Sequence, residues 1–303
     1  MTDRILEISD EPARLSARGG LLVISRPGRD EVTMPFADLA VLVVSHPQVS
    51  YTQAVLAELV ASGGAFVACD KRHLPVGMLL PLDAHYVQVE RFAVQAQAPL
   101  PLRKRLWREI VRAKVRAQGS LLAELHGDDQ GLVALAGQVR SGDPSNVEAQ
   151  ASRRYWPALF RDPAFRRNTE AEDQNRLLNY GYAVLRAIVA RAIAAAGLHP
   201  SLGLHHHNRY NSFCLADDLM EPFRPAVDKA VWDLVQSSGP DLALDRQAKT
   251  ALIQAVTGRL TVQGQSRTTF DAASIAASSL VAVIEKRAKR LVLPETSRAQ
   301  ADA

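Results

Sequence analysis

The sequence predicts an α+β fold, with a small β-rich N-terminal domain followed by a larger, mostly α-helical C-terminal domain. Up to about residue 95, short apolar runs rich in β-branched residues are bounded by Gly-Gly, Pro-Gly and His-Pro pairs, a pattern typical of strands. From residue 103 onward, apolar side chains recur at helical spacing. The chain has 303 residues, which is enough for two cores. We therefore place the domains at 1–95 and 103–293, joined by a linker at 96–102.

The N-terminal domain is expected to contain three clear strands and one helix. The strands are predicted at Leu21–Ser25, Ala37–Ser45 and Ala65–Cys69, because these apolar runs are bounded by glycine, proline or other turn residues. A helix is predicted at Gln53–Ala61, where apolar side chains recur every three or four positions before Gly63-Gly64. Since no group of catalytic side chains occurs here, we expect this domain to supply an interface rather than chemistry.

A basic helix is predicted directly after the linker, which is rich in proline and alanine. The helix, Arg103–Gln118, contains seven basic residues. One of its faces carries arginines and another carries apolar side chains, namely Arg105, Arg108, Arg112 and Arg116 on the first and Trp107, Val111 and Val115 on the second. The arginine face fits a DNA phosphate backbone, and it also fits an ordinary solvated helix surface.

Further helices and one hairpin account for the rest of the C-terminal domain. The helices are predicted at Asn168–Ala196, as one long helix or a closely spaced pair, and at Asp228–Gln236, Arg246–Val256 and Ala272–Arg290. The hairpin is predicted at Gly258–Phe270, around Gly264. Residues 294–303 are small and polar, and we expect them to form a disordered tail.

Composition restricts the classes of protein to be considered. Residues 1–95 carry eight Lys or Arg against eleven Asp or Glu, whereas the rest of the chain carries 28 against 21, so DNA would bind the C-terminal part. The cysteines, Cys69 and Cys214, show neither a disulfide framework nor metal spacing. No segment looks like a signal peptide or a membrane span. We expect a reduced, cytoplasmic protein without a membrane partner.

One segment rich in histidine and acidic residues indicates half of a metal site. This segment, Gly203–Pro225, reads GLHHHNRYNSFCLADDLMEPFRP and contains Asp217, Asp218 and Glu221 close to three adjacent histidines. A divalent cation that acts on phosphate esters prefers oxygen ligands, tolerates an imidazole and keeps positions open for substrate. Another ligand must come from elsewhere in the chain, and the isolated carboxylate of Glu148 is the candidate.

Glu148 also has a purely structural interpretation. Ser145 precedes it by three residues, which is the spacing of a capping box between a serine and a glutamate at the start of a helix. A carboxylate in the first turn of a helix also lies among free backbone amides and near Arg153 and Arg154, a setting that suits a substrate phosphate. The residues alone leave both interpretations open.

Three motifs together resemble a known family. They are GDPSNVEAQASRRYWPALF from Gly142, NRLLNYGYAVL at Asn175–Leu185, and GLHHHN followed by DLMEPFRP. In this order and separation they resemble the CRISPR-associated endonuclease that serves as the integrase of the adaptation module. The similarity is closest to the branch found with type II systems.

The resemblance implies a single metal site made by a glutamate, a histidine and a second acid. These positions fall on Glu148, His206 and Glu221, which would hold Mg²⁺ or Mn²⁺. His205 remains the alternative ligand because three histidines are adjacent. Asp217 and Asp218 remain possible supporting or alternative ligands.

The resemblance also implies an activity and partners. The activity is the insertion of short foreign DNA into a CRISPR array by attack of a 3′-hydroxyl on a phosphodiester, as part of antiviral defence, together with DNA cleavage. The expected partners are DNA, a second copy of the chain through the N-terminal domain, and a small ferredoxin-like protein. Candidate DNA contacts are the arginines near the motifs, namely Arg153, Arg154, Arg166, Arg167, Arg176 and Arg224.

Two other functions remain open at this point. In the first, the protein is a non-catalytic DNA-binding scaffold, with Glu148 as a helix cap and the histidines in a loop without metal. In the second, it is a metal-dependent hydrolase of a small phosphate ester, a function that the lack of a phosphate-cradling glycine loop disfavours.

Overall fold

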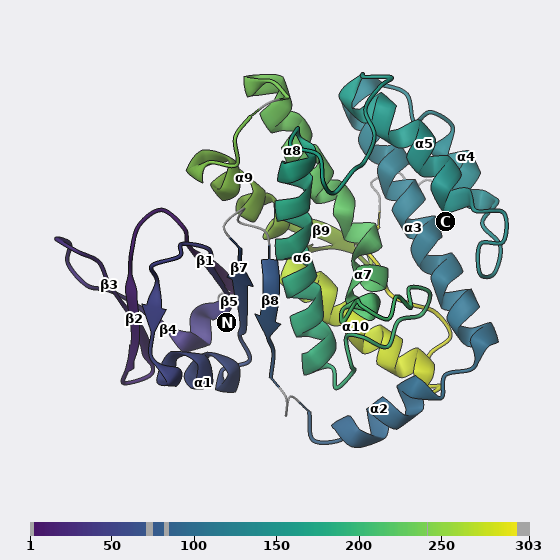
Figure 1. Ribbon diagram of the computed structural model, residues 1–303. Helices are drawn as coiled ribbons and strands as arrows, with labels where there is room; N and C mark the ends of the chain where they lie inside the picture. Colours follow the sequence, from purple (N-terminus) through teal and green to yellow (C-terminus); the bar gives the residue numbers. More distant parts are fainter. Residues whose placement is uncertain (1–2, 71–74, 82–84, 241, 296–303) are drawn as a thin grey trace.

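The computed structural model describes residues 3–70, 75–81, 85–240 and 242–295. Figure 1 shows strands gathered at the N-terminal end of the chain and helices in the rest of it, which confirms the predicted fold class. The predicted domain boundaries stay predictions. Of the expected tail, Pro294 and Glu295 are described, and Glu295 forms a β-bridge with Thr261, while residues 296–303 lie outside the described residues.

The described residues of the N-terminal part form two four-stranded sheets, one α-helix and one short 3-10 helix. One sheet has the order β1-β5-β7-β8, with parallel pairing except between β7 and β8, and the other has the order β4-β3-β2-β6. The elements are β1 (Arg4–Ile8), β2 (Arg14–Arg18), β3 (Leu21–Ser25), β4 (Val32–Pro35), η1 (Phe36–Asp38), β5 (Leu39–Val44), β6 (Ser50–Tyr51), α1 (Gln53–Ala61), β7 (Ala65–Cys69) and β8 (Pro75–Leu79).

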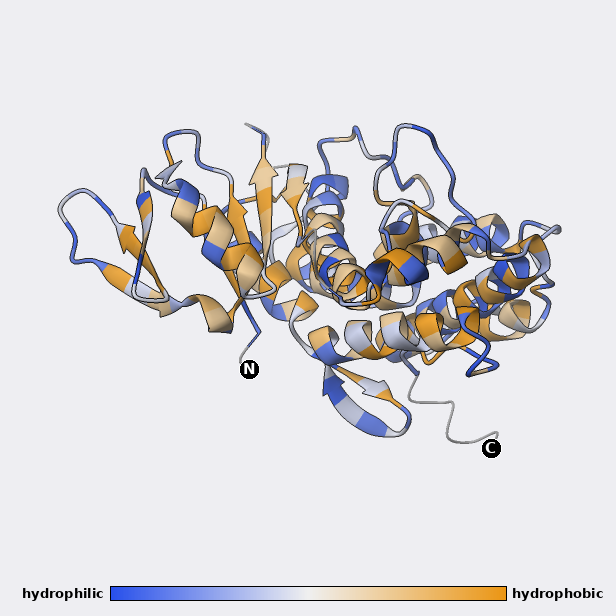
Figure 2. Cartoon of the chain, turned by 90° about the horizontal axis from the view of Figure 1, so that it is seen from below, coloured by the Kyte–Doolittle hydropathy of each residue, from blue (hydrophilic) through white to orange (hydrophobic). Residues whose placement is uncertain are grey.

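The remaining elements are mostly helices. They are α2 (Gln88–Ala96), α3 (Leu100–His126), α4 (Leu132–Gly137), α5 (Val147–Phe160), α6 (Asn175–Ala195), α7 (Cys214–Met220), η2 (Glu221–Phe223), α8 (Arg224–Ser238), α9 (Arg246–Val256), the hairpin β9 (Arg259–Val262) and β10 (Gln265–Thr268), and α10 (Thr269–Ile284). Figure 2 shows apolar stretches in strands of the N-terminal sheets and both polar and apolar stretches along the helices.

The central strand β5 joins the two parts through its alternating side chains. Val41 and Val43 point into the large core formed by the helices, while Leu42 and Val44 belong to a smaller core with α1. Successive side chains of a strand point to opposite faces, so one sheet contributes to two cores. The helix with the most extensive burial is α6, and it also packs on β5, β7 and β8.

Helix α6 is the one described helix with the length and apolarity to cross a membrane. Within its most apolar window, 78% of the residues are buried inside the protein. The sequence prediction that this helix extends from Asn168 was wrong, because it begins at Asn175. The side chains of Asn168 and Asp173 accept hydrogen bonds from the backbone amides of Glu170 and Asn175, and such turns compete with helix.

Other predicted elements also differ at their ends: the helix predicted at Asp228–Gln236 is Arg224–Ser238, and the strand predicted at Ala37–Ser45 is Leu39–Val44. The basic helix starts at Leu100 and runs to His126, so it begins within the segment 96–102 and before the predicted start at Arg103. Proline is accepted in the first helical turn because its missing N–H would have no partner there, and Pro101 lies in that turn. The last helix begins at Thr269, where the Thr268 hydroxyl accepts a hydrogen bond from the Asp271 amide, and it ends at Ile284.

Candidate active site

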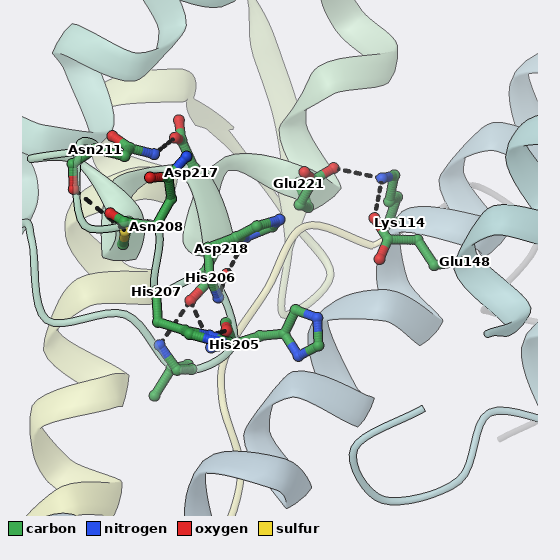
Figure 3. Close-up of polar contacts among 12 residues, drawn as sticks. Lys114, Glu148, His205, His206, His207, Asn208, Asn211, Asp217, Asp218 and Glu221 are labelled. Atoms are coloured by element: carbon green, nitrogen blue, oxygen red, sulfur yellow. Dashed lines mark hydrogen bonds and ion pairs between the residues drawn. The ribbon is translucent and has the colours of Figure 1, made fainter. Parts of the chain in front are cut away.

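The three predicted metal ligands come from three segments that meet beside α3. Glu148 lies in the first turn of α5, His206 lies in the loop between α6 and α7, and Glu221 begins η2. Figure 3 shows Lys114 of α3 between the two glutamates, with the histidine segment next to Glu221. The segments that were separate in the sequence are therefore neighbours in the fold.

Glu148 and Glu221 converge on one ammonium group. The Nζ atom of Lys114 lies 2.6 Å from Oε1 of Glu148 and 2.7 Å from Oε2 of Glu221. Lys114 and Glu221 are buried, with 8% and 4% of their surface exposed. Oε2 of Glu221 also forms an ion pair with Nε of Arg224 at 3.1 Å. Two carboxylates are thus held together by positive charge in a region of low dielectric.

The pKa values of this cluster reflect both burial and charge. Burial raises the pKa of Glu221, but the positive charges of Arg224 and Lys114 outweigh it and leave this pKa below its ordinary value. Burial lowers the pKa of Lys114, but Glu221 and Glu148 outweigh that effect and raise its pKa. Both groups are therefore charged at neutral pH, since each one stabilises the charged form of the other.

Glu148 is placed by a neighbouring aspartate rather than by a capping box. The carboxylate of Asp143 accepts hydrogen bonds from the backbone amides of Val147 and Glu148, at 2.9 and 3.0 Å. The predicted pairing of Ser145 with Glu148 is therefore wrong, because Asp143 already occupies these free amides at the start of α5. The Glu148 side chain is left to turn toward Lys114.

Asp218 organises the histidine segment from its interior. This carboxylate is fully buried and accepts hydrogen bonds from the amides of Leu204, His205 and His206 at 2.6, 2.9 and 3.2 Å. Its Oδ1 atom also lies 2.6 Å from Nδ1 of His206. At Gly203, a Cβ atom would come 2.2 Å from the His206 carbonyl oxygen, so the tight turn accepts only glycine.

His206 and His205 have different surroundings in the structure. The hydrogen bond to Asp218 raises the pKa of His206 above its ordinary value, against the effect of burial, and Glu221 and Glu148 add to this rise. With Nδ1 engaged, Nε2 is the ring nitrogen left for a ligand, an arrangement common among metal-binding histidines. His205 instead stacks on Trp107, with ring centroids 4.3 Å apart, and burial lowers its pKa.

Asp217 is committed to other partners. Its carboxylate accepts hydrogen bonds from Nε of Arg186 at 2.6 Å and from the side-chain amide of Asn211 at 2.7 Å. Asp217 therefore holds the loop before α7 through Asn211, while Asp218 holds the His206 ring. Of the two aspartates kept open in the sequence analysis, the structure places Asp218 next to the predicted ligands.

The donor chemistry of the cluster fits Mg²⁺ or Mn²⁺, but the present positions are those of an ion-pair network. Among the described residues, no three His, Cys, Asp or Glu side chains are close enough together to hold a metal ion. Two carboxylates and one imidazole nevertheless suit a hard divalent cation and suit structural zinc poorly. Lys114 lies between the two carboxylates, so these side chains must rearrange before they share a cation.

A cavity beside Glu221 collects four of the six predicted DNA-contacting arginines. It has a volume of about 520 Å³, and Lys114 and Glu221 form part of its wall. The arginines in its wall are Arg153, Arg166, Arg167 and Arg224, and the aromatic side chains are Trp156, Phe165 and Tyr182. The other two predicted arginines lie elsewhere: Nη1 of Arg154 faces Gly131, and Arg176 donates a hydrogen bond to the Leu242 carbonyl. Guanidinium groups and aromatic rings are the groups that bind nucleic-acid phosphates and bases.

Comparison with known proteins identifies the family. The family model described as "CRISPR associated protein Cas1" matches residues 6–241. The CRISPR-associated endonuclease Cas1 of Neisseria meningitidis is 37% identical over 299 residues, which cover 97% of each chain. This chain belongs to the Cas1 family. The resemblance inferred from the sequence motifs is thereby confirmed.

Solved structures show the same fold at low sequence identity. A casposase bound to an integration product superposes with a TM-score of 0.80 and 19% identity, over 95% of this Cas1 chain and 92% of that one. A chain of a Cas6-RT-Cas1–Cas2 complex has a TM-score of 0.75 and 14% identity, over 98% of this chain and 36% of the longer solved chain.

Sequence reasoning did not single out two groups of this Cas1-family site. Lys114 was counted only as one of the basic residues of its helix, although it follows Val111 by three positions and so falls on the apolar face. The second group is the buried Asp228, which accepts hydrogen bonds from the hydroxyls of Tyr155 and Tyr182. A charged residue on an apolar helix face was the available signal in both cases.

Proposed function

We propose that this protein is a metal-dependent DNA endonuclease and integrase that inserts short foreign DNA into a CRISPR array. The observation that carries the proposal is the pair of carboxylates, Glu148 and Glu221, held on one buried ammonium beside His206. Two carboxylates and an imidazole next to a cavity rich in arginine suit catalysis on a phosphodiester. The Neisseria relative is named as an endonuclease, which supports the same class of reaction.

Glu148, His206 and Glu221 would hold Mg²⁺ or Mn²⁺. When bound there, such an ion supplies positive charge that polarises a phosphate and stabilises the charge that develops on its oxygens. Asp218 keeps His206 in one orientation through Nδ1, and Arg224 neutralises part of the charge on Glu221. The protein's part is to place these groups before the DNA arrives.

The arginines of the cavity would hold the DNA backbone during the reaction. In the proposed step, the 3′-hydroxyl oxygen of the incoming strand bonds to the scissile phosphorus while the existing phosphorus–oxygen bond breaks. The attacking hydroxyl loses a proton and the leaving oxygen gains one, so the number of phosphodiesters and of hydroxyls is conserved. Cleavage is the same displacement with water as the attacking group. Tyr182 in the cavity wall is a poor nucleophile, because burial and Asp228 raise the pKa of its hydroxyl.

The same proposal covers the partners and the place of action. We expect a homodimer, formed through the N-terminal sheets, which acts with a small ferredoxin-like adaptation protein in the cytoplasm. The solved complex that contains Cas1 and Cas2 supports assembly with a second protein of the CRISPR system. The casposase bound to its integration product supports joining of DNA strands as a function of this fold.

Cleavage of branched DNA in Mn²⁺ tests the proposal. We expect Glu148→Ala and His206→Ala each to lower the cleavage rate by about 100-fold or more, because each variant removes a predicted ligand. Glu124→Ala is the matched control, since Glu124 is exposed on α3 and forms an ion pair with Lys229, away from the proposed ligands. Full activity in both site variants, with DNA still bound, would support a non-catalytic DNA-binding scaffold instead.

A further inference from the structure

Lys114 is a buried charged residue on the apolar face of α3, and the proposed reaction gives it no role. Its neighbours on that face, Val111 and Val115, are completely buried. Burying an ammonium is costly unless it is paired, and here it is paired twice, with Glu148 and with Glu221. An apolar side chain would be the ordinary occupant of this position, so the ammonium must serve the two carboxylates.

The charges of the cluster balance without any metal ion. Glu148 and Glu221 contribute two negative charges, and Lys114 and Arg224 contribute two positive charges. His206 and Asp218 form a separate hydrogen-bonded pair. A divalent cation would add two positive charges to a buried cluster that is already neutral. The divalent cation can therefore bind only if Lys114 or Arg224 moves away from the carboxylates, or if an anion joins the cluster.

We infer that Lys114 is a built-in counter-ion that competes with a divalent cation for the carboxylates of Glu148 and Glu221. This inference rests on the proposed function, because it takes these carboxylates as the metal ligands. The ammonium occupies the space between the two groups, so both cations cannot hold the same oxygen atoms at once. Metal affinity is thereby lowered until the ammonium moves away.

Lys114 is better suited to move than Arg224. The guanidinium carbon of Arg224 lies 4.5 Å from the ring centroid of Tyr182, and the planar group is fixed there by stacking. Lys114 has a compact charge on a flexible stem and borders the cavity of about 520 Å³ beside the site. The cavity offers the ammonium room, and a DNA phosphate bound there would offer it a new partner.

Binding of Mn²⁺ alone, without DNA, tests the inference. Calorimetric titration should show that Lys114→Met binds Mn²⁺ about tenfold or more tightly than the wild type, since the competing charge is gone. Thermal unfolding should agree: Lys114→Met should melt below the wild type in EDTA and gain more stability from Mn²⁺. If Lys114→Met does not fold, Lys114→Gln provides the same comparison with a polar side chain.

Two matched variants control for the substitution. Lys114→Arg keeps the positive charge and should bind Mn²⁺ within about twofold to threefold of the wild type. Lys229→Met makes the same chemical change at a half-exposed position, paired with Glu124, and should not change Mn²⁺ affinity. Equal or weaker binding by Lys114→Met than by the wild type would overturn the inference. Absence of Mn²⁺ binding in the wild type and in Lys114→Met alike would instead overturn the proposed metal site.

Discussion

Asp228 on α8 connects the core of the helical part to the candidate site. Only 1% of its surface is exposed, and it accepts hydrogen bonds from Tyr155, at 2.7 Å, and from Tyr182. Burial raises the pKa of Asp228 to about 6, although both hydrogen bonds act in the opposite direction. The Tyr182 ring in turn supports Arg224, the partner of Glu221, so a single buried carboxylate influences how the cavity wall is held.

The raised pKa of Asp228 predicts a pH dependence of stability. Folded Asp228 keeps its proton to higher pH than the unfolded chain does, so its contribution favours folding at low pH and is lost as the pH rises from about 4 to about 6. Asp228→Asn cannot titrate. The free energy of unfolding of the wild type minus that of the variant should therefore fall by about 3 kcal/mol over this range. Urea unfolding of both proteins at a series of pH values measures this difference in unfolding free energy. A difference that stays constant with pH would contradict the prediction.

At the scale of elements, the first turn of α5 determines where Glu148 lies. This turn has no side-chain cap at Asn146, and the carboxylate of Asp143 serves the amides of Val147 and Glu148 instead. The first turn of a helix frays unless its free backbone amides find hydrogen-bond acceptors. A loss of Asp143 should therefore loosen the turn that carries the proposed ligand.

The variant Asp143→Gly tests this link between a helix start and the site. Glycine accepts the positive φ of 48° at this position, so the variant removes the carboxylate without adding backbone strain. We expect a loss of about 1 kcal/mol in unfolding free energy and a fall in Mn²⁺-dependent DNA cleavage of about tenfold. Asp245→Gly is the control, since Asp245 caps α9 by accepting from the Ala248 amide at 2.8 Å, away from the site. The Asp245→Gly variant should lose a similar amount of unfolding free energy and keep its DNA-cleavage activity. Equal cleavage by the two variants would contradict the prediction.

At the scale of the whole molecule, a buried ion pair joins the N-terminal sheet to the helical part. Nζ of Lys249 on α9 lies 3.3 Å from Oε1 of Glu7 on β1, and the two side chains are 5% and 9% exposed. The hydroxyl of Ser45 also donates a hydrogen bond to Glu7, at 3.4 Å. This polar contact between β1 and α9 adds to the apolar contacts that β5 makes with both cores.

Removal of Lys249 should therefore destabilise the whole fold. Lys249→Met leaves the Glu7 carboxylate buried without its cation, which typically costs about 3–5 kcal/mol. The double variant Glu7→Gln with Lys249→Met should recover part of this loss, because no charge then remains unpaired. Urea unfolding of the wild type, both single variants and the double variant measures the coupling. Additive effects would show that the pair does not join the two parts energetically.

Much of the secondary structure could be predicted because its signals are local. The helices Gln53–Ala61 and Arg246–Val256 and the strand Ala65–Cys69 were predicted with the boundaries that the structure has. In each case apolar spacing and nearby glycine or capping residues act within a few positions. Strands β1, β2, β4, β6 and β8 were not predicted, because their sequences are short or mixed in polarity and only pairing with neighbouring strands selects them.

By itself, the sequence determined the fold class, the family and the candidate ligands Glu148, His206 and Glu221, since these depend on residue types and their order. Only the tertiary structure showed that Lys114 joins the two glutamates and that Asp143, rather than Ser145, holds the start of α5. Lys114 and Glu148 are 34 positions apart. Such a pair is selected by the packing of α3 against α5 and η2, and the energy of burying a charge depends on that packing rather than on neighbours along the chain.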